Sequence, residues 1–153
     1  MNFSWVDMNI AASAYLWDRE NIEYVIEKHG INVIINLSGN SYDNPYPDKL
    51  ELIDHKIHDF GTPTEKEMNE LLQLIQKKIE EKKKILIHCV AGCGRTGMVI
   101  AIYKISKQPN KNREEIINEL RQLRPCSIDN QEQYEFVLNF QLDSQNSHKI
   151  IDL

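Results

Sequence analysis

The segment from His88 to Thr96 has the residue types and spacing of a phosphate-binding loop that carries a nucleophile. It reads His-Cys-Val-Ala-Gly-Cys-Gly-Arg-Thr and lies between the apolar run 84–88 and a stretch with helical spacing. Where a strand ends and a helix begins, the N–H groups of the loop and of the helix N-terminus converge and form a cradle for an anion. We therefore expect phosphate to be bound by the backbone of Val90, Ala91, Gly92, Cys93, Gly94 and Arg95.

Three side chains of this segment predict covalent chemistry on the bound phosphate. Cys89 lies at the base of the cradle, where positive potential favours the thiolate, the nucleophilic form of cysteine. Arg95 presents a planar guanidinium that can bind two phosphate oxygens at once. Thr96 can donate its hydroxyl to the sulfur and stabilise the thiolate, both as nucleophile and as leaving group. Together they predict a loop that binds phosphate and holds a nucleophile at its floor.

At these residues the chain resembles the protein tyrosine phosphatase superfamily. Residues 88–96 match its motif His-Cys-x2-Gly-x2-Arg-Ser/Thr at every fixed position. The resemblance implies a cysteine-dependent phosphatase fold with no cofactor and no metal, and it gives His88 an orienting role beneath the loop. Further stretches are similar to the small atypical dual-specificity phosphatases, namely Phe3–Val6, Gly30–Ile31, Asp59–Pro63 and Leu123–Pro125.

The same resemblance assigns the general acid. An alkoxide or aryloxide leaves poorly without a proton, so the first step needs an acid near the leaving oxygen. Asp59 lies 30 residues before Cys89, in a turn-rich segment between a strand and a helix, where this family holds its acid loop. We expect Asp59 to fill this role, and we regard Asp54, expected in mid-strand, and Asp129 as less well placed.

One position departs from the family pattern. Many tyrosine-specific members carry Gln-Thr-x-x-Gln after the last loop, and the first Gln positions the attacking water. Here Asp129 stands at that first position, while Gln133 matches the second. We expect water positioning to differ and to fall to Asp59 alone, and no role is assigned to Asp129 or Gln131.

The three cysteines are expected to be free thiols. Residues 1–5 do not have the composition of a signal peptide, so a reducing cytoplasm, or also the nucleus, is the expected location. We expect the Cys93 side chain to line the mouth of the pocket and see no role for Cys126. A Cys89–Cys93 disulfide would be conceivable under oxidation.

Strands and helices alternate along the chain, which predicts an α/β fold with a central, largely parallel sheet flanked by helices. We expect one phosphatase domain over residues 1–153, with residues 143–153 as a frayed tail. Strands are expected at 3–6, 9–12, 31–37, 50–57 and 84–88, and helices at 21–29, 64–79, 95–106, 114–123 and 131–142.

Composition narrows the choice of partners. The net charge of −5 argues against nucleic acid, and no apolar stretch reaches the roughly 18 residues of a membrane span. The histidines are scattered without metal-site spacing, and a monomer is expected. A phosphorylated protein is the expected substrate, with phosphotyrosine favoured and phosphoserine or phosphothreonine also open.

Three alternative functions remain open. A phosphoinositide phosphatase of the same superfamily would usually carry lysines where this chain has Val90 and Cys93. An RNA 5′-triphosphatase is disfavoured by the acidic net charge. A catalytically silent phosphate-binding module would be unexpected, since Cys89, Arg95 and Asp59 are all present.

Overall fold

The computed structural model describes residues 1–143 and contains a five-stranded sheet in the order β1-β2-β5-β3-β4. Strands β2, β5, β3 and β4 run parallel, and the short β1 pairs antiparallel with β2 at one edge. The expected largely parallel α/β sheet is therefore confirmed. The strands span Ser4–Trp5 (β1), Ile10–Ser13 (β2), Val33–Asn36 (β3), Glu51–Asp54 (β4) and Ile85–His88 (β5).

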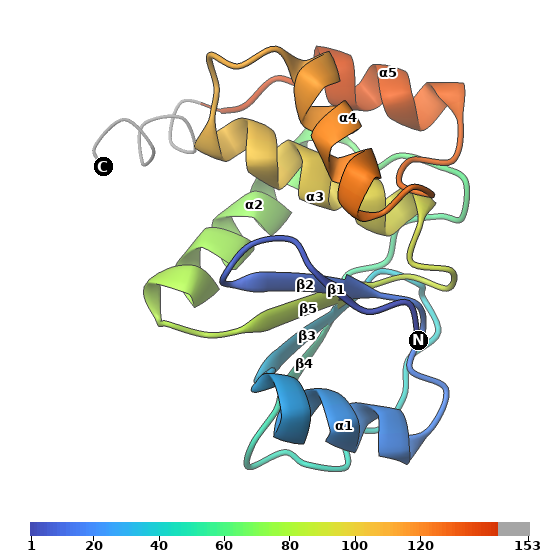
Figure 1. Ribbon diagram of the computed structural model, residues 1–153, viewed down its shortest axis with the longest axis vertical. Coiled ribbons are helices and arrows are strands. Elements are labelled where there is room, and N and C mark those ends of the chain that lie inside the picture. Colours follow the sequence, from blue (N-terminus) through green and yellow to red (C-terminus); the bar gives the residue numbers. More distant parts are fainter. Residues whose placement is uncertain (144–153) are drawn as a thin grey trace.

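Helices cover both faces of the sheet (Figure 1). One face packs against α1 alone, while α2 to α5 gather on the other. The central strand β5 contributes to both cores, because Ile85 and Ile87 point into the larger one and Leu86 into the smaller one. The helices span Arg19–His29 (α1), Glu65–Glu80 (α2), Gly94–Lys107 (α3), Arg113–Leu123 (α4) and Gln131–Asn139 (α5).

Local signals define most helix ends. Thr64 and Glu67 form the expected capping box at the start of α2, each side chain bonding the other's backbone N–H. Gly30 ends α1 in the left-handed conformation at φ 69°, also as expected. The helix expected over 131–142 ends earlier, at Asn139. Its last carbonyls are bound by the guanidinium of Arg113, and Phe140 is extended and buried in the core.

The strand expected over 50–57 is also shorter, because regular pairing of β4 ends at Asp54. The chain nevertheless continues along β3, since His55 and Ile57 donate backbone hydrogen bonds to Asn36 and Leu37. This continuation carries the following residues to the carboxyl ends of the parallel strands. The expected frayed tail lies, apart from Asp143, outside the described residues. No helix within residues 1–143 is long and apolar enough to cross a bilayer.

Candidate active site

The phosphate-binding loop occupies residues 89–93, between the end of β5 and the start of α3. In the part of the chain that the structure describes, the N–H groups of residues 90–93 donate no hydrogen bond. Those of Gly94 and Arg95 belong to the first turn of α3, where intrahelical acceptors are absent. Gly92 has φ 76°, and a Cβ there would lie 2.6 Å from the carbonyl carbon of Ser13. The loop therefore fits against β2 only with glycine at 92, and it leaves a row of N–H donors available to an anion.

Cys89 lies on the floor of this loop, and its side chain is buried. The Thr96 hydroxyl donates a hydrogen bond to Cys89 Sγ at 3.1 Å. This geometry is what the sequence predicted for the pair. A donated hydrogen bond favours the thiolate over the thiol, both before attack on phosphorus and when sulfur leaves.

Arg95 is 3% exposed, and neighbouring loops hold its guanidinium in place. Nη1 donates to the carbonyls of Ile57 at 3.0 Å and Ser38 at 3.3 Å, while Nη2 lies 3.3 Å from Asp59 Oδ1. The chain segments after β3 and β4 thus orient the same side chain. The structure thereby brings together the two charged groups that sequence reasoning placed in the site.

Asp59 lies on an exposed turn before α2, and its side chain is 59% exposed. Two residues from the start of α5 hold this turn: Asn130 donates to the Phe60 carbonyl at 2.9 Å, and Gln133 donates to the Gly61 carbonyl at 3.2 Å. The rival Asp54 is instead the last residue of β4 and accepts a hydrogen bond from Ser41.

His88 is fully buried beneath the loop. Its Nδ1 lies 3.0 Å from the carbonyl of Cys89, and its Nε2 lies 2.8 Å from the hydroxyl of Tyr42. Burial lowers the pKa of His88, so the imidazole is neutral, and burial raises the pKa of Tyr42 above its usual value. A carbonyl only accepts, so Nδ1 carries the proton and Nε2 accepts from Tyr42. This tautomer ties the loop to the segment after β3.

Arg124 is a contributor that sequence reasoning did not assign. It is 2% exposed, and its Nη2 donates to the Gly92 carbonyl at 2.7 Å. Its Nη1 reaches the carbonyl of Asn2 at 2.6 Å and the hydroxyl of Ser4 at 3.1 Å. Burial lowers the pKa of Arg124 from its usual value. The side chain binds the Gly92 carbonyl of the loop and ties the loop to the N-terminal segment.

The expectation of three free thiols is wrong. Cys93 and Cys126 form a disulfide, with Cα atoms 5.0 Å apart, and Cys89 is the remaining free cysteine. The cause is that the segment after α4 folds back over the loop, where the Ile128 N–H donates a backbone hydrogen bond to the Cys93 carbonyl at 3.2 Å. Cys93 therefore does not line the mouth of the pocket as a thiol, and Cys126 has a role as its disulfide partner. While this bond exists, Cys93 cannot pair with Cys89. The cysteines also no longer argue for a reducing compartment.

Asp129 lies closer to the cradle than its sequence position suggested. A Cβ added to Gly94 would lie 2.7 Å from Asp129 Cγ and 2.9 Å from Gln133 Oε1. The carboxylate is thus packed on the first residue of α3. Across residues 1–143, no group of three or more His, Cys, Asp or Glu side chains has the arrangement of a metal site.

A buried cysteine under a row of N–H donors, with an arginine fork beside it, defines the class of cysteine-dependent phosphatases. The family model of the dual specificity phosphatase catalytic domain matches residues 14–143. The chain therefore belongs to the dual-specificity phosphatase family, and its fold is that of the protein tyrosine phosphatase superfamily.

The chain is also similar to individual known proteins. An uncharacterized protein of Methanocaldococcus jannaschii is 30% identical over 95 residues, which are 62% of this chain and 58% of that protein. The match therefore spans less than two thirds of that relative. The active form of Tk-PTP is 27% identical, with a TM-score of 0.76 over 97% of this chain and 98% of that one. PTPMT1 in complex with PI(5)P shares the fold at 16% identity, with a TM-score of 0.78 over 99% and 98% of the two chains.

Proposed function

We propose that this chain is a protein phosphatase that hydrolyses phosphotyrosine, and also phosphoserine or phosphothreonine, in protein substrates. The observation that carries the proposal is the position of Cys89 Sγ. It lies 3.1 Å from the Thr96 hydroxyl, on the floor of a loop whose N–H groups at residues 90–93 donate to no acceptor within residues 1–143 and can bind phosphate oxygens. A nucleophile directly below an anion cradle is placed to attack phosphorus.

In the first step the Cys89 thiolate attacks phosphorus, the bond from phosphorus to the leaving oxygen breaks, and Asp59 gives its proton to that oxygen. Arg95 and the loop N–H groups hold the remaining phosphate oxygens as charge develops on them. Phosphate bound to Arg95 would replace the ion pair that Asp59 makes with the guanidinium. Asp59 is then available at the mouth, where the leaving oxygen departs.

In the second step water attacks the phosphorus of the cysteinyl-phosphate and the P–S bond breaks. The proton of the water passes to Asp59, which restores the acid, and the sulfur leaves as a thiolate that accepts the hydrogen bond from Thr96. The cycle consumes one water and releases inorganic phosphate. His88 and Arg124 position the loop in both steps through their contacts with Cys89 and Gly92.

The surroundings of the loop favour an aromatic phosphoester over a highly charged one. Phe60, next to the acid, is 63% exposed, and Val90, in the loop, is 36% exposed. These apolar side chains suit the ring of phosphotyrosine. Neither Val90 nor Cys93 offers the positive charge that a phosphoinositide headgroup would need. The proposal therefore favours a phosphoprotein, although the similar fold of PTPMT1 makes a phosphoinositide the comparison to run.

Phosphate release from a phosphotyrosyl peptide, a phosphoinositide and a triphosphorylated RNA, measured side by side, tests the proposal. We expect kcat/KM to be largest for the peptide and to fall to background in Cys89→Ser. A higher kcat/KM for either of the other two substrates would contradict the proposed substrate class. No turnover of any of them by a folded protein would contradict catalysis itself.

A further inference from the structure

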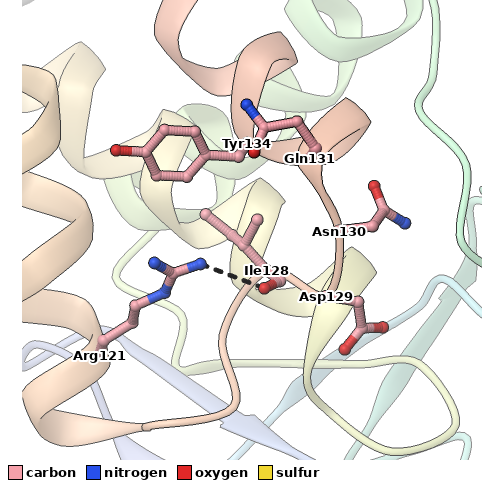
Figure 2. Close-up of a pocket in the computed structure, with 6 residues that line it drawn as sticks. All are labelled: Arg121, Ile128, Asp129, Asn130, Gln131 and Tyr134. Atoms are coloured by element: carbon pink, nitrogen blue, oxygen red, sulfur yellow. Dashed lines mark hydrogen bonds between the residues drawn. The ribbon is translucent and has the colours of Figure 1, made fainter.

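Ile128 has a strained backbone conformation next to the active site. Its φ is 68°, in the left-handed region that a β-branched residue rarely adopts. Such a conformation persists only where the surroundings enforce it, and it is concentrated at functional sites. Here the Ile128 N–H donates to the Cys93 carbonyl at 3.2 Å, and Arg121 donates to the Ile128 carbonyl at 3.2 Å (Figure 2). The Cys93–Cys126 disulfide holds the same segment.

The strained residue places Asp129 on the rim of the cradle. The Asp129 N–H donates to Gln133 Oε1 at 2.9 Å, and Gln133 is itself fully buried and bonded to the acid loop. The carboxylate packs against Gly94, where a Cβ would lie 2.7 Å from Asp129 Cγ. Figure 2 shows it pointing away from Arg121 and Tyr134, the cation–π pair of a pocket that Asp129 also lines.

The charge on Asp129 is not neutralised. Among the described residues its carboxylate has no ion pair and no side-chain hydrogen bond. Asp59, the other carboxylate at the rim, is paired with Arg95 and must carry a proton when it acts as the acid. Asp129 is therefore the negative charge that stays beside the bound phosphate throughout the first step.

A fixed negative charge at this place discriminates between phosphate substrates. The charge on Asp129 repels the scissile phosphate of every substrate, and Arg95 and the loop N–H groups offset this repulsion. Coulomb energy falls with distance, so an additional penalty falls only on a substrate with a second anionic group close to the first. Specificity of this kind comes from a repulsive contact with the wrong substrate.

We propose that Asp129 is a specificity-determining residue, which excludes substrates with a second phosphate beside the scissile one and so favours isolated phosphorylated side chains. This proposal rests on the proposed function, because it names Asp129 as the residue that limits which phosphate substrates the site accepts. A phosphotyrosyl side chain in a protein carries a single phosphate on a neutral ring, whereas inositol polyphosphates place phosphates on adjacent ring carbons.

The test compares kcat/KM for a phosphotyrosyl peptide and for a soluble inositol polyphosphate in wild type and Asp129→Asn. We expect the variant to raise the ratio of inositol polyphosphate to peptide about tenfold at low ionic strength. At about 1 M salt the Debye length is about 3 Å, so the difference should nearly vanish. Asp129→Glu keeps the charge and should keep the discrimination of the wild type.

Asp48→Asn is the matched control, because Asp48 is an exposed carboxylate in the loop before β4, at the amino ends of the parallel strands. It should leave the ratio unchanged. The inference is overturned if Asp129→Asn has the melting temperature of the wild type and also leaves the ratio of inositol polyphosphate to peptide unchanged. A wild-type enzyme that prefers the inositol polyphosphate contradicts the proposed function instead, so the two failures are distinguishable.

Discussion

Removing the Cys93–Cys126 disulfide should destabilise the protein by an amount that depends on the number of residues between the two cysteines. The two cysteines are 33 residues apart, and closing a loop of that length lowers the entropy of the unfolded chain enough to contribute about 3–4 kcal/mol. For a chain of this size, that loss corresponds to a fall in melting temperature of about 7–15 °C. Cys126→Ser removes the bond and leaves Cys89 untouched.

Urea unfolding of wild type and Cys126→Ser, each with and without dithiothreitol, measures this contribution. The reductant should lower the midpoint of the wild type to that of the variant, and the midpoint of the variant should not move. Suppose that reduction raises the number of free thiols in the wild type from one to three but leaves its urea midpoint unchanged. That result would refute the reasoning. A wild type that already has three free thiols before reduction would refute the disulfide itself.

Three further predictions concern the site. Arg95→Lys should lower both kcat and affinity for phosphotyrosyl peptide, because an ammonium cannot bind two oxygens side by side; an unchanged kcat/KM would contradict the assigned contact. Asp59→Asn should lower kcat about 10²–10⁴-fold for phosphotyrosyl peptide, whose leaving group has a pKa of about 10, and much less for an aryl phosphate with an acidic leaving group. A structural role would slow both substrates equally. The lowered pKa of His88 means that the unfolded chain gains a proton below about pH 6.5 that the folded protein excludes, so stability should fall as pH falls through this window. Unfolding at pH 7.5 and 5.5 should show a smaller loss in His88→Asn, and an equal loss would contradict the neutral, buried imidazole.

The catalytic loop could be predicted from the sequence because its parts are close together in the chain. Cys89, Arg95 and Thr96 lie within one strand–loop–helix unit, so their spacing alone determines that they share a cradle. The capping box at Thr64 and the stop at Gly30 are likewise local. Such features depend on backbone geometry over a few residues, and specific residue types are strongly preferred in that geometry.

The contacts that could not be predicted form because the segment after α4 folds back over the phosphate-binding loop. Arg124 and Cys126 reach Gly92 and Cys93 only because α4 packs against α3, and no periodicity in the sequence reports that contact. The early end of α5 depends on Arg113, which lies on another helix. Asp129 departed from the family pattern, so the resemblance that assigned the other residues offered no role for it.

Acid quenching of the enzyme during turnover of a phosphotyrosyl peptide, followed by mass spectrometry, tests the central claim most directly. The account predicts one phosphoryl group on the peptide that contains Cys89, trapped in wild type and absent in Cys89→Ser. Asp59→Asn should slow the appearance of this species with the peptide substrate. A phosphoryl group on any other residue, or rapid turnover in Cys89→Ser, would contradict Cys89 as the nucleophile.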